Sequence, residues 1–324
     1  MSSQLNHRKT AFWGLTMLVF VLACTIVLGP TTSAPPTAPA LDPTKAALEL
    51  QGTALAMQLT QAAMNLQVQQ PTQPPPVNPQ DIPTQPQILP APTQDLMARM
   101  KTAKILVYEN TDERNIGMWV SDALDDLGLT YTNTGSYSGH FMEYLNSGTI
   151  YDLIIVDAED KDKISGEFWD VINTRLTRDK VALIVEIWYL DREANGPINK
   201  IMSRCGIAYQ ADWDFAESIY WWDPTNPIFN EPNTVLPLIH YSMFWTSGHG
   251  EAGDKIRLGG SGDATLLAGL SASPQSRSAL LATCMQGRVI FQTFSDHDYH
   301  EGDVIPLWEN YIYNTLKAHF EAVQ

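Results

Sequence analysis

The chain has 324 residues, which is enough for one large domain or two small ones. Its formal net charge is -16, and residues 101–324 carry all of it, because the +2 of residues 1–29 cancels the -2 of residues 30–100. An acidic domain repels nucleic-acid phosphates and anionic lipid headgroups, so we expect no DNA or RNA partner.

The N-terminal segment, residues 1–29, is predicted to be a membrane anchor. An uncharged, mainly apolar run fills residues 11–29 and would reach about 28 Å as a helix, close to the thickness of the hydrocarbon core. The basic flank at Arg8 and Lys9 would stay in the cytoplasm, so residues 30–324 are expected outside it. The lipid membrane is therefore the first predicted partner.

Two alternatives remain for the same segment. The tetrapeptide Val21-Leu22-Ala23-Cys24 resembles a bacterial lipobox, which would make Cys24 a lipidation site and residues 1–29 a lipoprotein signal. A cleaved secretion signal is the other alternative. Anchor and lipoprotein both leave residues 30–324 tethered outside the cytoplasmic membrane.

Residues 30–100 are predicted to be a spacer. They are rich in Pro, Thr, Ala and Gln, contain too few apolar residues for a core, and are stiffened by proline. Residues 44–69 contain no proline and are rich in helix formers, so they predict a helix. That helix is either a marginal element of the spacer or a short self-associating coil that makes an oligomer, which Gly52 argues against.

From residue 101 onward, apolar strands and amphipathic helices alternate. "KILVYE", "YDLIIVDAED" and "VALIVEIWYLD" are solid apolar runs, and helical patterns such as "NIGMWVSDALDDLG" lie between them. This alternation predicts an α/β fold with a mostly parallel sheet flanked by helices. Later come β-like pieces, with a hairpin turn at residues 285–288, and "IPLWENYIYNTLKAHFEAV" is expected to be the closing helix.

This order of elements resembles the class I glutamine amidotransferase-like superfamily, which has a flavodoxin-like α/β fold. The resemblance rests on "KILVYEN", "YDLIIVDAED", "NPIFNEP" and "GRVIFQTFSDHDY…LWENYIYNTL", and covers about residues 103–320. It implies a nucleophilic cysteine in a Gly-rich elbow after a central strand and a histidine after the last strand. The corresponding stretch, "VEIWYLDRE", has no cysteine, serine or glycine. The chain is thus expected to be a degenerate member without glutamine hydrolysis.

The two other cysteines do not supply the missing group. Cys205 lies at the end of a predicted helix, where no elbow is expected, and Cys284 lies in a predicted strand. They form no CxxC pair of a zinc site, and the sequence leaves open whether they bond to each other.

Strands of parallel sheets present ligand-binding residues at their carboxyl ends. Here those ends carry Asn110, Asp157 and the stretch from Glu186 to Trp188. His297 follows the last strand, close to the place of the family's histidine but offset from it. His297, Asp157 and Glu186 are therefore the catalytic candidates, and Asn110 joins the ligand-binding candidates.

The stretch "FSDHDYHEGD" is the densest cluster of titratable residues. Carboxylates and imidazoles together suit a divalent metal, with Asp296, His297, Asp298 and His300 as candidate ligands. The stretch matches neither the helical zinc-protease pattern nor an EF-hand. The alternative interpretation is a solvated loop that caps the last helix.

Tryptophans suggest a second kind of site. Trp188, Trp221 and Trp222 could line a cleft beside Asp157 and His297, where aromatic faces would stack on a carbohydrate or another small ligand. The alternative is that these indoles pack in the core.

The function predicted from these features is a membrane-anchored, extracytoplasmic binding or scaffolding domain of the bacterial cell envelope, without catalysis. Its ligand would be a protein partner or a glycan. The alternatives are a metal-assisted hydrolase of glycans or of another small substrate, and an accessory subunit of a membrane complex.

Overall fold

The computed structural model describes residues 93–111, 116–160, 166–215, 217–241 and 252–323. The predicted anchor, Cys24 and the spacer up to residue 92, with its predicted helix, lie outside these ranges. Among the helices of the described ranges, none is both long and apolar enough to cross a bilayer.

Four parallel strands form the first half of a single sheet, in the order β2-β1-β3-β4. Apolar, β-branched residues fill the three central strands, as in a sheet that is covered on both faces. The elements of this half are α2 (Thr93–Met100), β1 (Ile105–Glu109), α3 (Trp119–Asp126), β2 (Tyr131–Asn133), α4 (Ser138–Asn146), β3 (Leu153–Asp157), α5 (Phe168–Arg178) and β4 (Ala182–Glu186).

The second half of the sheet is antiparallel and continues from β4 as β10-β9-β7-β5, while β8 pairs with β9 and with β6. Among the strands of the described residues, only β10 belongs to both halves, because it pairs in parallel with β4 and antiparallel with β9. The elements of this half are α6 (Leu190–Glu193), α7 (Asn199–Cys205), β5 (Ile207–Trp213), β6 (Tyr220–Trp221), η1 (Pro227–Phe229), β7 (Gly253–Leu258), β8 (Thr265–Gly269), β9 (Ala279–Cys284), β10 (Val289–Gln292), η2 (Asp296–Asp298) and α9 (Glu301–Ala322).

The α/β class is confirmed, but the prediction of a mostly parallel sheet is wrong. Across the 10 strands, four pairings are parallel and five are antiparallel. The expected hairpin turn is present between β9 and β10, with positive φ at Met285, Gln286 and Gly287. Because a tight turn reverses the chain, it makes β9 antiparallel to β10.

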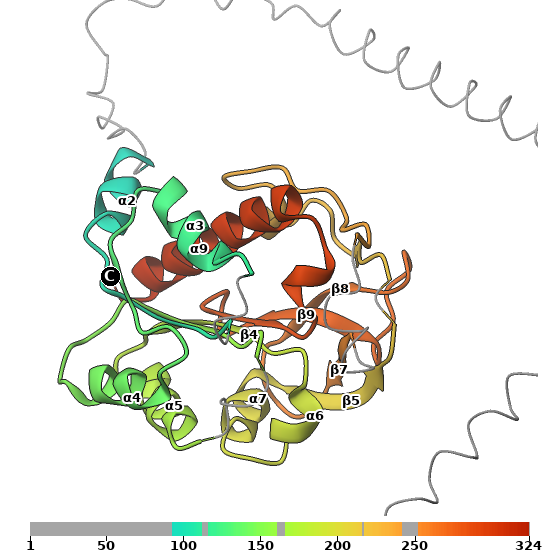
Figure 1. Cartoon of the computed structure of the whole chain (residues 1–324), viewed down its shortest axis with the longest axis horizontal. Helices are drawn as coiled ribbons and strands as arrows, with labels where there is room; N and C mark the ends of the chain where they lie inside the picture. The colour runs from blue at the N-terminus through green and yellow to red at the C-terminus, as the bar shows by residue number, and fades with distance from the viewer. Residues whose placement is uncertain (1–92, 112–115, 161–165, 216, 242–251, 324) are drawn as a thin grey trace, which may run out of the picture. The chain divides into compact units, whose positions relative to one another are not determined.

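Helices cover both faces of the sheet (Figure 1), and strand alternation divides the core between the two faces. Ile105 and Val107 of β1 face the cluster that contains α3 and α9, whereas Leu106 and Tyr108 face the cluster that contains α4, α5 and α7. The closing helix α9 buries Leu307, Tyr311, Leu316 and Phe320, as its sequence pattern predicts.

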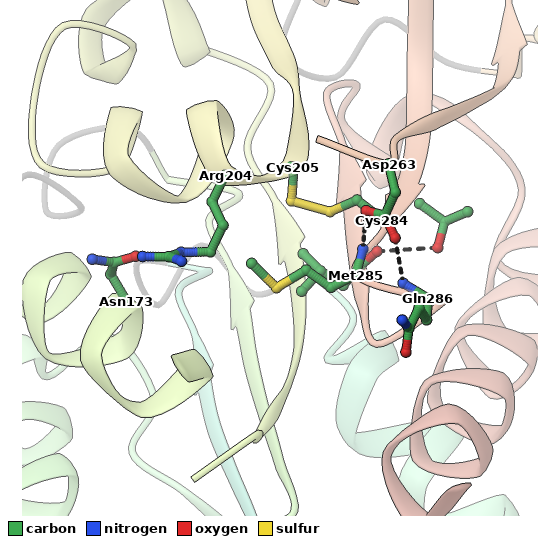
Figure 2. The surroundings of a disulfide bond; sticks show 9 residues. Asn173, Arg204, Cys205, Asp263, Cys284, Met285 and Gln286 are labelled. Carbon is green, nitrogen blue, oxygen red and sulfur yellow. Dashed lines mark hydrogen bonds between the residues drawn. A yellow bond between two sulfur atoms is a disulfide. The ribbon is translucent and has the colours of Figure 1, made fainter. Parts of the chain in front are cut away.

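A disulfide between Cys205 and Cys284 fastens the end of α7 to the end of β9 (Figure 2). Helix α7 ends at Gly206, which has φ 82°. The neighbouring Gly262 passes so close that a Cβ there would lie 2.0 Å from the Cys205 carbonyl. Asp263 accepts hydrogen bonds from the backbone N–H of Met285 and of the next residue at 2.6 and 2.8 Å, which holds the hairpin turn against the disulfide.

Removal of the disulfide should destabilise the domain. The bond closes a chain segment of 79 residues, and the loss of such a cross-link costs about 4 kcal/mol in chain entropy. We expect the double variant Cys205→Ala/Cys284→Ala to lower the free energy of unfolding in urea by about that amount. Cys24→Ser is the matched control and should leave it unchanged; equal stability of all three proteins would refute the role of the bond.

Candidate functional site

The carboxyl ends of four strands carry a row of polar side chains. Glu109 ends β1 and is paired with Asp157 of β3, which is paired with Glu186 of β4, and Glu186 is paired with Gln292 of β10. Because directly paired residues point to the same side of a sheet, all four side chains lie on the face of α3 and α9. Each is at most 3% exposed. The sheet thus buries three carboxyl groups in one register row.

Glu109 has a structural task within this row. Its Oε1 accepts hydrogen bonds from the backbone N–H of Val120 at 3.0 Å and of Ser121 at 3.2 Å, in the first turn of α3. Its Oε2 accepts from the Ser121 hydroxyl and from the Asn133 amide. Burial raises the pKa of Glu109, and these donors offset part of that rise. The residue therefore fixes the start of α3 on the end of β1.

Asp157 and Glu186 form the centre of the row together with Glu159. One oxygen from each of the three carboxyl groups lies within 4.8 Å of the others. Burial raises the pKa of Asp157 and of Glu186 well above the ordinary range, and the charge of Glu159 raises both further. Asp157 and Glu186 are hydrogen-bonded to each other, so in the absence of a cation they share a proton.

Glu159 is ionised because it is surrounded by donors. It accepts from the Asp296 backbone N–H at 2.7 Å and the Ser295 hydroxyl at 2.9 Å, and its Oε1 lies 3.1 Å from His297 Nδ1. Burial raises the pKa of Glu159, but the positive charge of His297 and these hydrogen bonds lower it overall. Conversely, burial lowers the pKa of His297, and the charge of Glu159 more than restores it, so the pKa is raised overall and the protonated imidazole is favoured.

Both ring nitrogens of His297 are engaged. Nε2 lies 3.2 Å from the carbonyl oxygen of Gly117, and Nδ1 faces Glu159. The ring stacks on the indole of Trp119, with centroids 4.0 Å apart and planes 15° apart. A protonated imidazole whose two N–H groups both meet acceptors has no lone pair with which to take a proton from a substrate.

Asp296 points inward rather than toward solvent. Its two oxygens accept from the side-chain amide of Gln292 and from the indole N–H of Trp308. Burial, followed by the charge of Glu159, raises the pKa of Asp296 to about 7. Asp296 therefore changes its protonation state near neutral pH.

A pocket of about 300 Å³ lies over His297. Aromatic and polar side chains surround it, and Tyr241, which is 68% exposed, stands on its wall. Its described lining consists of Ile116, Gly117, Trp119, Tyr241, His297, Tyr299, His300 and Glu301. Larger hollows of about 460 and 410 Å³ lie at the amino ends of the strands and between α4 and α5, and neither includes a member of the carboxyl row.

The three tryptophans of the predicted ligand cleft do not lie together in the structure. Trp188 is fully buried in the cluster of α4, α5 and α7, whereas Trp221 is buried in the opposite cluster and stacks on Phe229. Trp222 is partly buried, and its indole N–H donates to the Ser271 carbonyl. Strand alternation sends neighbouring tryptophans to opposite faces, so the ligand-cleft interpretation is not retained.

The predicted metal ligands also point in different directions. Asp296 is turned into the core, and Asp298 is buried. His300 is exposed and caps α9 by accepting from the Gly302 N–H at 3.1 Å. Among the described residues, the group that could hold a metal is instead formed by the predicted site residues Asp157 and Glu186 together with Glu159, which was not predicted. The 3-10 turn η2 separates the side chains that the sequence places side by side.

Asn110, another predicted ligand contact, braces two loops. Its side-chain amide donates to the Asp160 carbonyl at 2.7 Å, and its backbone N–H donates to the Asp157 carbonyl at 2.9 Å. Asp157, Glu186 and His297, in contrast, lie around Glu159. The carboxyl group of Glu159 is close to those of Asp157 and Glu186 and contacts Nδ1 of His297. The signal that could have found Glu159 is its place two residues after Asp157, just beyond the end of a buried strand.

Comparison with known proteins adds no assignment, because the chain matches no protein-family model and no curated protein. The resemblance to the glutamine amidotransferase-like superfamily stays a hypothesis that rests on the residues quoted above.

Breaking the buried ion pair should be costly. In His297→Ala, Glu159 would keep its charge without its cationic partner, so we expect a loss of about 3 to 5 kcal/mol in the free energy of unfolding. The double variant His297→Ala/Glu159→Gln removes the stranded charge and should recover at least half of that loss. Urea unfolding of the three proteins checks this; a double variant no more stable than His297→Ala would contradict the ion pair.

The stability of the domain should fall as pH rises. Asp296 has a folded pKa of about 7 against an unfolded value of about 3.9, so between these values the folded state binds more protons than the unfolded state. The raised pKa values of Asp157 and Glu186 act in the same direction, and the contribution of His297 is lost as pH rises through its raised folded pKa.

Urea midpoints measured with chelator at pH 5, 6, 7 and 8 should therefore decrease steadily. Asp296→Asn should reduce the slope between pH 5 and 7. A midpoint that rises over this range, or a variant whose slope equals that of the parent, would show that these buried carboxyl groups are ionised without penalty.

Proposed function

We propose that the domain is a non-catalytic binding or scaffolding module of the bacterial cell envelope, held outside the cytoplasmic membrane by residues 1–29. The Cys205–Cys284 disulfide supports this placement, because such bonds persist in oxidising compartments outside the cytoplasm. The proline-rich spacer would carry the domain away from the lipid surface.

The observation that carries the proposal is the state of the groups around the pocket. Both ring nitrogens of His297 lie against acceptors, the Glu159 carboxylate and the Gly117 carbonyl, which favours the protonated ring and works against a role as general base. Both cysteines of residues 101–324 are joined in the disulfide, so neither is a free thiolate. Among the described lining residues there is no cysteine, serine, threonine or lysine that could act as a nucleophile. The described lining thus offers surfaces for binding and none of these four kinds of nucleophile.

The walls of the pocket suit a glycan or a protein segment. Tyr241 and Tyr299 supply aromatic surface, while Glu301 and His300 supply polar groups at the start of α9. Aromatic faces with a few polar groups are the usual composition of small-ligand sites.

A metal-assisted hydrolase remains the second candidate, because Asp157, Glu159 and Glu186 form a compact carboxylate group. The burial of these groups argues against this candidate, because each of the three side chains is at most 3% exposed and a substrate would have little access to them. A binding module needs only the pocket, so it fits the described geometry better.

Thiol trapping in cells tests the proposed location of the domain outside the cytoplasm. In a Cys24→Ser variant, only the disulfide cysteines remain, so acid-quenched and denatured protein should react with a maleimide only after reduction. The same variant without residues 1–29 is the matched control and should be labelled at both thiols. Labelling of the full chain without reductant would place the domain in a reducing compartment.

Co-sedimentation with purified cell-wall sacculi tests binding. We expect the full chain to sediment, and Tyr241→Ala to weaken binding about tenfold, the worth of one aromatic contact. Tyr137→Ala is the matched control, since Tyr137 is exposed immediately before α4 and lies outside the pocket. Release of soluble fragments by the parent, abolished in Glu186→Gln, would instead establish the hydrolase.

A further inference from the structure

We infer that Asp157, Glu159 and Glu186 form a binding site for a hard divalent cation of the Mg²⁺ and Ca²⁺ class. The site lies between the ends of β3 and β4, on the face covered by α3 and α9. It concerns residues beneath the pocket, so it stands independently of what the pocket binds.

The spacing of the oxygens fits one ion. One oxygen from each carboxyl group lies within 4.8 Å of the other two. Ca²⁺ holds its oxygens at 2.3–2.6 Å, so two ligands on opposite sides of one ion are about 5 Å apart. All three oxygens can therefore contact a single cation without moving a strand. The register pairing of Asp157 with Glu186 fixes two of them on rigid elements.

Two of these carboxyl groups present oxygens that meet no donor from any other described residue. Apart from a proton shared between the two groups themselves, neither Asp157 Oδ1 nor Glu186 Oε1 meets a hydrogen-bond donor within the described residues, and both atoms are buried. The nearby donors are used elsewhere: the Ala158 N–H bonds the other oxygen of Glu186, and the donors of residues 295–297 bond Glu159. A buried acceptor without a donor is costly, and a cation would satisfy both oxygens at once.

Charge balance points to a divalent ion. When they are ionised as ligands, Asp157 and Glu186 place two negative charges in a buried space, where Glu159 already contacts His297 as its own partner. A net buried charge costs several kcal/mol per ion, so an uncompensated group of this kind is strongly unfavourable. One divalent cation would balance it, and it would tie the loop of Glu159 to β3 and β4.

The ligand type selects the class of ion. All three groups offer carboxylate oxygens, and the imidazole beside them already uses Nδ1 and Nε2 in other contacts. Oxygen-only sites favour Mg²⁺, Ca²⁺ or Mn²⁺ over the softer metals that prefer nitrogen and sulfur. This set differs from the sequence-predicted one, which drew its ligands from residues 296–300.

Thermal unfolding of the full chain provides the first test. The protein is stripped with chelator, dialysed at pH 8, and melted with increasing CaCl₂, MgCl₂ or MnCl₂. We expect at least one cation to raise the melting temperature saturably, by about 5 to 10 °C at a hundredfold excess over its Kd. Asp157→Asn and Glu186→Gln should lose this shift, and Asp170→Asn, on an exposed carboxylate bonded to Lys200, should keep it.

Terbium luminescence provides a second readout that does not depend on variants. The Trp188 indole donates to the Glu159 carbonyl at 2.9 Å, so a bound Tb³⁺ would lie close to a tryptophan that can sensitise its emission. We expect saturation at one Tb³⁺ per chain and displacement by Ca²⁺. The inference is overturned if no cation shifts the melting temperature, if the two ligand variants shift as the parent does, or if Tb³⁺ emission never saturates.

Discussion

The ion pair between Glu159 and His297 is the contact on which the carboxyl edge of the sheet depends. Glu159 follows β3 in the parallel half, and His297 follows β10, the strand that belongs to both halves. The pair can form because β10 lies next to β4, and the β9–β10 hairpin brings it there. One buried contact thus joins segments that are far apart in the sequence and fixes the floor of the pocket beneath Trp119.

This arrangement buries several carboxyl groups close together, and each of them has different partners. Glu109 accepts hydrogen bonds from the start of α3, and Asp296 accepts them from Gln292 and Trp308. Glu159 has His297. Asp157 and Glu186 are left with each other, so a shared proton or a bound cation must supply the missing positive charge. Proton and cation compete for the same oxygens, which links the pH dependence of stability to cation binding.

Much of the fold could be predicted from the sequence. Solid apolar runs located β1, β3 and β4, helical spacing located α3 and α9, and the turn at residues 285–288 located a hairpin. The mixed sheet could not be predicted, because periodicity does not say which strand pairs with which. β10 inserts beside β4 although the whole second half of the domain lies between them in sequence.

The site was predictable only in part. The rule that ligands gather at carboxyl strand ends identified Asp157 and Glu186, and the last strand pointed to His297. Glu159 was missed because it lies in a loop, where no periodic pattern marks a buried residue. The expected metal set failed because the turn η2 aims Asp296 inward, while His300 lies outside as a helix cap. Such orientations depend on packing against Trp308, which a local sequence pattern does not reveal.

Infrared spectroscopy of the cation-free full chain at neutral pH tests the central claim most directly. A buried carboxyl row that lacks a cation must hold protons, so the account predicts the C=O stretching band of a protonated carboxylic acid. The band should weaken in Asp157→Asn and on addition of the bound cation. A spectrum with only ionised carboxylates at neutral pH, in the absence of any cation, would contradict the account.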